Sequence, residues 1–135
     1  NWENGYKAQA AYGQSKLANL LFTYELQRRL TAAGKDTLAV AAHPGWTETN
    51  LQEHAKPVKF LNRFLAQQPS MGALPTLYAA TEPSVKGAEY FGPSGFMEMN
   101  GPPKRVKSNK RSHDQNIAER LWNVSEDLTG VHFQI

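Results

Sequence analysis

The feature that most constrains the fold is a short apolar run, residues 37–42, in which hydrophobic and polar side chains do not alternate. A strand with one face in water alternates the two kinds, whereas a parallel-sheet strand covered on both faces does not. Pro44 and Gly45 follow the run and form a strong turn signal. We therefore expect residues 37–42 to be a strand buried on both faces.

A long helical pattern precedes this strand, from residue 8 to residue 32. Apolar residues recur at helical spacing on one face, and others add a second apolar face, so we expect the middle to be buried nearly all round. Such a helix packs between two partners, for example a sheet and a neighbouring subunit. Gly34 is a good signal for its end. The two faces consist of Leu17, Leu20, Leu21 and Tyr24, and of Ala18, Phe22 and Leu26.

Beyond the turn, the chain alternates helical patterns with one more strand. We expect helices at 58–66 and 70–80, the second kinked at Pro75, and a short strand at 87–93. Strands that alternate with helices indicate an α/β layer with a parallel sheet. Two strands cannot cover a doubly buried one, so we expect the remaining strands to lie upstream of this sequence.

The last part of the chain should be a loop followed by a helix. Pro102 and Pro103 argue against regular structure in the loop at residues 95–112. Ser112 would then be the N-cap of a helix that ends at Gly130. We expect Trp122 to pack against the rest of the protein. The inner stripe of this helix would consist of Ile117, Leu121 and Val124.

Composition excludes several kinds of site. The 135 residues suffice for one domain, and the lack of cysteine rules out disulfides and thiolate metal sites and suits the cytoplasm. No apolar run approaches the ~20 residues of a membrane span. Positive charges gather at residues 104–111 without interleaved aromatic residues, which predicts a solvated loop and no nucleic-acid surface. His54, His113 and His132 lack the spacing of metal ligands, so we predict no metal.

Tyr12 and Lys16 are the strongest candidates for chemistry. They are four residues apart and project from the same face of the expected helix. A free phenol has a pKa of about 10, and a neighbouring ammonium lowers it by stabilising the phenolate. Bringing a phenol to neutrality requires about 4 kcal/mol, which one cation in a partly dry site can supply. The pair is therefore either a proton donor and acceptor or a rim tyrosine beside a solvated lysine.

Two motifs around these residues resemble one family. The stretch YGQSK is followed at once by LANLLFTYEL, and further along the chain by HPGWTETNL. A Tyr-x-x-x-Lys motif on a long helix, then a Pro-Gly-x-x-x-Thr motif after the next strand, is typical of the short-chain dehydrogenase/reductase family. The chain is most similar to its retinol-dehydrogenase-like and WW-domain-oxidoreductase-like branch, over essentially its whole length.

The resemblance implies a role for each residue of the first motif. Tyr12 would be the general acid/base that protonates a carbonyl oxygen in reduction or deprotonates an alcohol in oxidation. Lys16 would stabilise the phenolate and hydrogen-bond the nicotinamide ribose, so both residues also bind the cofactor. Ser15 is not the family's catalytic serine, which lies upstream.

The second motif would complete one wall of the cofactor site. Pro44 and Gly45 would shape the turn against the nicotinamide ring. Trp46 and Thr47 would offer backbone groups to the carboxamide, and the Thr49 hydroxyl would bond the carboxamide or the pyrophosphate. Ligands bind beyond the carboxyl ends of strands in open α/β sheets, which is where this loop lies. Taken alone, the segment would be a strand-terminating turn.

Part of the family's pattern is absent. The sequence has no Gly-x-x-x-Gly-x-Gly fingerprint, and the family's catalytic serine and structural asparagine lie upstream. Residues 1–135 therefore resemble the C-terminal portion of a single doubly wound, parallel-sheet Rossmann domain without its N-terminal nucleotide-binding half. Alone, this chain would neither bind cofactor tightly nor turn over.

The implied activity is hydride transfer between NAD or NADP and a carbonyl/alcohol pair. The resemblance slightly favours NADP, although the residues that read the 2′-position belong to the missing half. Apolar residues at 46–64 and 90–99 suit a lipophilic small-molecule substrate. We expect His43 to bond to backbone at the strand end rather than to touch substrate or cofactor.

A different possibility is a non-catalytic module that keeps the fold for association. The helix at 8–32 would then be the interface. As an enzyme, too, the chain would form a homo-oligomer through this helix or through the exposed edge of the strand at 37–42.

Overall fold

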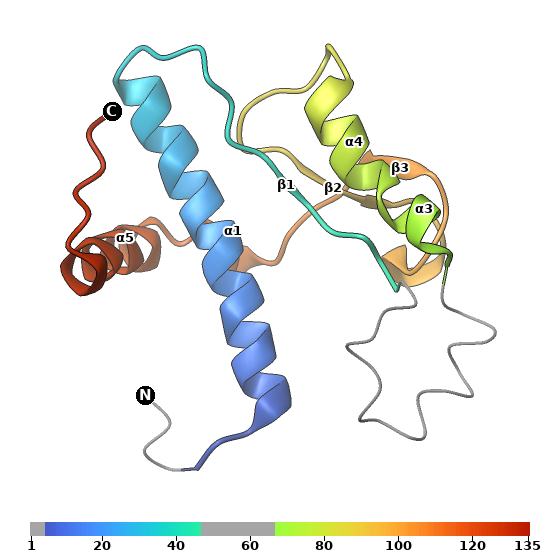
Figure 1. Cartoon of the computed structure of the whole chain (residues 1–135), viewed down its shortest axis with the longest axis horizontal. Helices are drawn as coiled ribbons and strands as arrows, with labels where there is room; N and C mark the ends of the chain where they lie inside the picture. The colour runs from blue at the N-terminus through green and yellow to red at the C-terminus, as the bar shows by residue number, and fades with distance from the viewer. Residues whose placement is uncertain (1–4, 47–66) are drawn as a thin grey trace. The chain divides into compact units, whose positions relative to one another are not determined.

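The computed structural model describes residues 5–46 and 67–135 (Figure 1). The chain divides into two compact units, each described here by itself. The helical unit comprises Asn1–Ala39 and Ser108–Ile135, and the sheet unit comprises Val40–Lys107. Nowhere in the described parts of the chain is a helix both long enough and apolar enough to cross a membrane.

The helical unit is built on α1, Ala8–Ala32, which confirms the helix expected at these residues. Alanine, leucine and long polar side chains dominate its sequence, and these favour the helix. The helix ends as expected, because Gly34 adopts a φ of +65° and reverses the chain. Figure 1 shows α1 as the long blue helix.

Burial of α1 is narrower than its apolar pattern predicts. Leu21, Glu25 and Leu30 are buried, whereas Phe22 on the second apolar face is 45% exposed. The expectation of burial nearly all round is therefore wrong for this structure. The physical reason is that α5 and a neighbouring 3-10 turn cover one side of α1.

The second helix of this unit is α5, Gln115–Thr129, preceded by the 3-10 turn η3, Lys110–His113. Asp114 is its N-cap, with Oδ1 accepting a hydrogen bond of 3.1 Å from the Ile117 amide. The prediction of Ser112 as N-cap is wrong, because Ser112 is buried in η3 and its amide donates to Asn109. Gly130 ends α5 with a φ of +68°, as expected.

Trp122 forms the core between α5 and α1, which confirms its packing role. Its indole stacks on Phe22 with ring centroids 5.3 Å apart, and the Arg29 guanidinium lies 4.4 Å from its centroid. The inner face of α5 consists of Ala118 and Trp122. The predicted stripe of Ile117, Leu121 and Val124 is therefore wrong, since the first and last of these residues are exposed.

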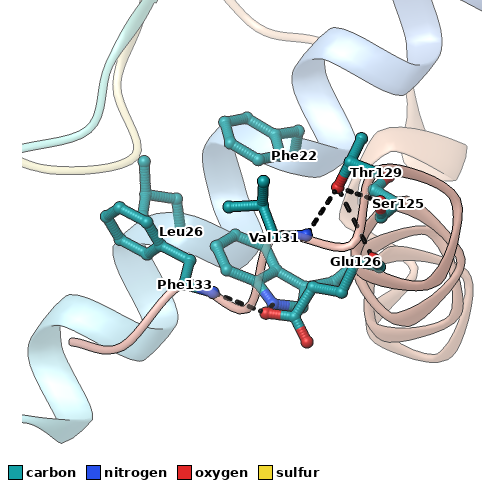
Figure 2. Close-up of a pocket in the computed structure, with 8 residues that line it drawn as sticks. Phe22, Leu26, Ser125, Glu126, Thr129, Val131 and Phe133 are labelled. Carbon is teal, nitrogen blue, oxygen red and sulfur yellow. Dashed lines mark hydrogen bonds between the residues drawn. The ribbon is translucent and has the colours of Figure 1, made fainter.

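A cavity of about 480 Å³ opens beside Trp122 (Figure 2). Its walls come from α1, from α5 and from the chain after α5. The Glu126 carboxylate closes one side by accepting hydrogen bonds from the Trp122 indole at 2.9 Å and from the Phe133 amide at 3.1 Å. The lining residues are Phe22, Leu26, Trp122, Ser125, Glu126, Thr129, Val131 and Phe133.

The sheet unit contains a three-stranded mixed sheet in the order β1-β2-β3. β1, Ala41–Ala42, and β2, Tyr90–Pro93, run parallel, with Ala41 opposite Tyr90. This confirms an α/β arrangement with parallel pairing of the two expected strands.

The third strand, β3, Pro103–Arg105, pairs antiparallel with β2. The expectation of loop throughout residues 95–112 is therefore wrong at this point. Pro103 is tolerated because it is the first residue of an edge strand, where a missing amide donor costs little. The segment before it contains the 3-10 turn η2, Phe96–Glu98.

β1 is shorter than the strand expected at 37–42. Leu38 is 49% exposed and both residues of β1 are only partly buried, so the prediction of a strand buried on both faces is wrong for this structure. The Ala39 amide donates to the Gln27 side chain at 2.7 Å instead of to a neighbouring strand. The Gln27 side chain of α1 thus accepts a hydrogen bond from an amide that would pair with another strand if β1 were longer.

Among the described residues of the sheet unit, two short helices lie before β2: α3, Pro69–Gly72, and α4, Leu74–Thr81. The kink expected near Pro75 is a break at Ala73, and Pro75 lies in the first turn of α4, where proline is favoured. The Tyr78 ring of α4 lies 5.5 Å from that of Phe91, which is fully buried in the sheet. The helix expected at 58–66 lies outside the described residues.

Candidate active site

Tyr12 and Lys16 lie on one face of α1, as their spacing requires. The Lys16 ammonium nitrogen lies 5.2 Å from the centroid of the Tyr12 ring. Tyr12 is 55% exposed and Lys16 is also exposed, so both can reach a molecule bound on this side of the helix. The Ser15 hydroxyl donates to the Tyr12 carbonyl oxygen at 2.8 Å, so its proton serves the helix backbone.

The turn of Pro44, Gly45 and Trp46 follows β1 directly. Gly45 has a φ of +66°, and a Cβ built on it would lie 2.5 Å from the carbonyl oxygen of Met99 and 2.9 Å from that of Glu98. Only glycine therefore fits this position. The Trp46 amide donates to the Met99 carbonyl at 2.7 Å, and this bond ties the turn to the loop after β2.

Gln67, which lies about twenty residues further along the chain, holds the same turn. Its backbone amide donates to the Trp46 carbonyl at 2.9 Å, and its side-chain amide donates to the Pro44 carbonyl at 2.6 Å. Sequence reasoning missed this residue. The sequence gives no reason to choose Gln67 over the neighbouring Gln68. The two residues differ in burial, which only the structure shows: Gln67 is buried and Gln68 is exposed.

His43 precedes the turn and supports it, as expected for a histidine bonded to backbone. Its Nδ1 accepts a hydrogen bond of 3.3 Å from the Gly45 amide. Its Nε2 faces Gly92 and lies 3.2 Å from a Glu98 carboxylate oxygen. That approach lacks hydrogen-bond alignment, and within the described residues the buried Nε2 has no hydrogen-bond partner. His43 thus contributes to the shape of the turn through Nδ1.

The loop after β2, which contacts the turn through Met99, has an unusual backbone conformation. Met97 and Glu98 have φ values of +49° and +57°, which side chains other than glycine rarely adopt. Such conformations persist only where surrounding contacts impose them, and they gather at functional sites. Here the bond from the Trp46 amide to the adjacent Met99 is one such contact.

The predicted site residues fall into two groups. Tyr12 and Lys16 belong to the helical unit, whereas Pro44, Gly45 and Trp46 belong to the sheet unit. The structure brings together the members of each group. Thr47 and Thr49 lie outside the described residues.

The backbone amide and carbonyl of Trp46, which the sequence suggests for cofactor binding, already make hydrogen bonds within the protein. Its amide is used by Met99 and its carbonyl by Gln67, both within the sheet unit. To bind here, a cofactor carboxamide would have to replace Met99 as the partner of the Trp46 amide. Otherwise it would have to donate to the Trp46 carbonyl oxygen alongside Gln67.

A buried carboxylate supports the other unit. Glu25 is 1% exposed and accepts hydrogen bonds from Arg28 at 2.7 and 2.8 Å and from Arg29 at 2.6 Å. Burial by itself would raise the pKa of the Glu25 carboxyl, but these hydrogen bonds outweigh it and hold the pKa below its ordinary value. The described residues contain no group of three His, Asp or Glu side chains that could hold a metal.

Comparison with known proteins identifies the relatives of this chain. Human polyprenol dehydrogenase is 36% identical over 93% of the chain and 38% of its own length. A short chain dehydrogenase/reductase of Macrophomina phaseolina is 35% identical over 93% of the chain and 62% of its own length. Retinol dehydrogenases 11 and 12 of human are each 35% identical. The chain is a homologue of the short-chain dehydrogenases/reductases.

A solved structure shares the fold of this chain. A crystal structure of an uncharacterised protein from Mycobacterium paratuberculosis is 43% identical, with a TM-score of 0.76 over all of this chain and 44% of that one. No family model matches the chain. The chain spans about two fifths of the length of human polyprenol dehydrogenase and the retinol dehydrogenases. The resemblance noted in the sequence is thereby confirmed.

Proposed function

We propose that this chain carries the proton-transfer part of an oxidoreductase active site. The reaction would be hydride transfer between NAD or NADP and a carbonyl/alcohol pair. Homology to retinol and polyprenol dehydrogenases supports an oxidoreductase at the level of the family. The observation that carries the specific proposal is the exposed pair of Tyr12 and Lys16 on one helix face. The Lys16 Nζ lies 5.2 Å from the centroid of the Tyr12 ring.

Tyr12 is the proposed general acid and base. In reduction, its hydroxyl would donate a proton to the carbonyl oxygen of the substrate; a bound nicotinamide would be the source of the hydride that the carbonyl carbon accepts. In oxidation, its phenolate oxygen accepts the proton of the alcohol. The Lys16 ammonium lies on the same helix face and is proposed to interact favourably with that phenolate.

The turn after β1 is proposed to hold the nicotinamide end of the cofactor. The conformation of Gly45 fits this role, because it lets the chain reverse tightly beyond the carboxyl end of β1. Since the Trp46 amide is engaged, the carboxamide would be bound chiefly by Thr47 and Thr49. NADP is slightly favoured by the resemblance. The 135-residue chain alone is proposed to be inactive, since it lacks the glycine fingerprint.

A lipophilic substrate is part of the proposal. The relatives named above are dehydrogenases of retinol and polyprenol. Phe96 and Met97 are about three quarters exposed beside the turn, at 77% and 76%, and could contact an apolar substrate. Association of copies through α1 or through the edge strand β1 also remains a proposal.

The test replaces Tyr12 by phenylalanine in the complete gene product. With NADPH and retinal, Tyr12→Phe should lower kcat by at least about 100-fold, because general acid catalysis contributes 10²–10⁴. Tyr6→Phe removes a hydroxyl from another exposed tyrosine of the helical unit and should leave kcat unchanged. Unchanged turnover in Tyr12→Phe would contradict the proposal and favour a non-catalytic association module.

A further inference from the structure

Gln67 is a buried polar residue whose side chain links two separate segments of the sheet unit. It is 9% exposed. Its Nε2 donates to the Pro44 carbonyl at 2.6 Å, and its Oε1 accepts from the Gly101 amide at 3.2 Å. One side-chain amide therefore joins the turn after β1 to the loop before β3. Buried polar groups are kept where such partners satisfy them.

The same loop holds the turn at a second point. The Trp46 amide donates to Met99, two residues before Gly101, and a Cβ on Gly45 would meet the Met99 carbonyl. The turn is thus fixed at the Pro44 carbonyl by Gln67 and at the Trp46 amide by Met99. These two bonds orient both peptide planes that flank Gly45.

We infer that Gln67 is a positioning residue that sets the orientation of the Pro44–Gly45 peptide for cofactor binding. The inference rests on the proposed function, in which this turn lies against the nicotinamide. Without the Gln67 side chain, the Pro44 carbonyl loses the 2.6 Å hydrogen bond from Nε2, and the orientation of the peptide is held less firmly. The turn would then have to be ordered by the cofactor, which weakens binding.

Two variants of the complete gene product separate positioning from packing. Gln67→Met keeps the length and shape of the side chain but removes both hydrogen bonds. Gln67→Glu keeps the acceptor for Gly101 but sets a carboxylate oxygen against the Pro44 carbonyl. When that carboxyl is protonated, it can donate to Pro44 and accept from Gly101, which reproduces the native pattern. Gln68→Met is the matched control, because Gln68 is adjacent and exposed.

The expected result is a change in cofactor affinity rather than in turnover. In Gln67→Met, Kd and KM for NADPH should rise about tenfold or more at pH 7, with kcat changed less than about threefold. In Gln67→Glu, Kd should be raised at pH 7 and should fall toward the wild-type value near pH 5, because burial shifts protonation of a carboxyl upward. His43 and Glu98 also face the turn, so the wild type measured at each pH corrects for their titration. Gln68→Met should match the wild type throughout.

Three outcomes would overturn the inference. An unchanged Kd in Gln67→Met with an active wild type would reject the positioning role and leave the proposed function standing. A raised Kd in Gln67→Glu that does not recover on acidification would show that only packing was disturbed. A wild type that neither binds NAD or NADP nor turns over would reject the proposed function, and the inference with it.

Discussion

The two units hold their proposed site residues in opposite ways. In the helical unit, Tyr12 and Lys16 stand on an exposed face, and the buried face is secured by side chains such as Glu25 and Trp122. In the sheet unit, the turn around Gly45 is fixed largely by backbone atoms of a distant loop and by the Gln67 amide.

This difference follows from what each group has to present. A pair of side chains four residues apart is oriented by helix geometry alone, so its supports can lie elsewhere on the helix. A turn that presents its own backbone needs an exact peptide orientation, and that requires left-handed φ values and buried polar contacts. Substitutions in the helical unit should therefore act through proton transfer or through global stability. Those in the turn should act through its backbone conformation, and so on stability and on the proposed cofactor affinity.

The largest stability effect is expected from Gly45→Ala in the sheet unit. The left-handed φ and the overlap with the Met99 carbonyl should together lower the free energy of unfolding by about 3 kcal/mol. Urea unfolding followed by circular dichroism measures the loss. Gly13→Ala in α1 is the matched control, since a Cβ there meets nothing within 4 Å and alanine favours the helix. If the two substitutions lowered the free energy of unfolding equally, the proposed difference between the turn and the helix would be wrong.

An intermediate effect is expected from Glu25→Gln in the helical unit, about 2 kcal/mol at pH 7, because hydrogen bonds to two arginines are weakened. The folded-state pKa of Glu25 is lowered from 4.5, so its stabilisation is present above pH 4.5 and is lost as pH falls through the folded value. The wild type should therefore lose its advantage over Glu25→Gln on acidification. Thermal unfolding between pH 3 and pH 7 checks this.

The control for that pH series is Asp127→Asn, which neutralises an exposed carboxylate of the same unit. Its difference from the wild type should be small at every pH. If the advantage of the wild type over Glu25→Gln stayed constant down to pH 3, the buried ion pair would not be the source of acid sensitivity.

The smallest effect is expected from Asp114→Ala, which removes the N-cap of α5. The loss should be about 1 kcal/mol, because one amide of the first turn loses its acceptor. Asp114→Ser should recover most of it, since serine is also a good N-cap. Thermal unfolding of the two variants compares them. A loss in Ser112→Ala alone, with none in Asp114→Ala, would restore Ser112 as the cap.

Sequence alone predicted what local patterns determine. The bounds of α1 and the end of α5 at Gly130 follow from periodicity and glycine signals within a few residues. The Tyr12–Lys16 pair likewise needs only helix geometry.

Features that depend on distant partners were not predictable in the same way. β3 forms because residues up to Arg105 pair with β2, although Pro102 precedes the strand and Pro103 begins it. The buried state of Gln67 depends on Pro44 and Gly101, which are remote in sequence. The N-cap choice between Ser112 and Asp114 was decided by the extra turn η3.

The placement of the tryptophans gives the protein a natural pair of optical reporters. Trp122 lies in the core of the helical unit and Trp46 in the turn of the sheet unit, while Trp2 is the third and last. With Trp2 and either one of the others replaced by phenylalanine, the emission of the remaining indole reports on a single unit. Two such variants would report on the helical unit and on the turn after β1 separately.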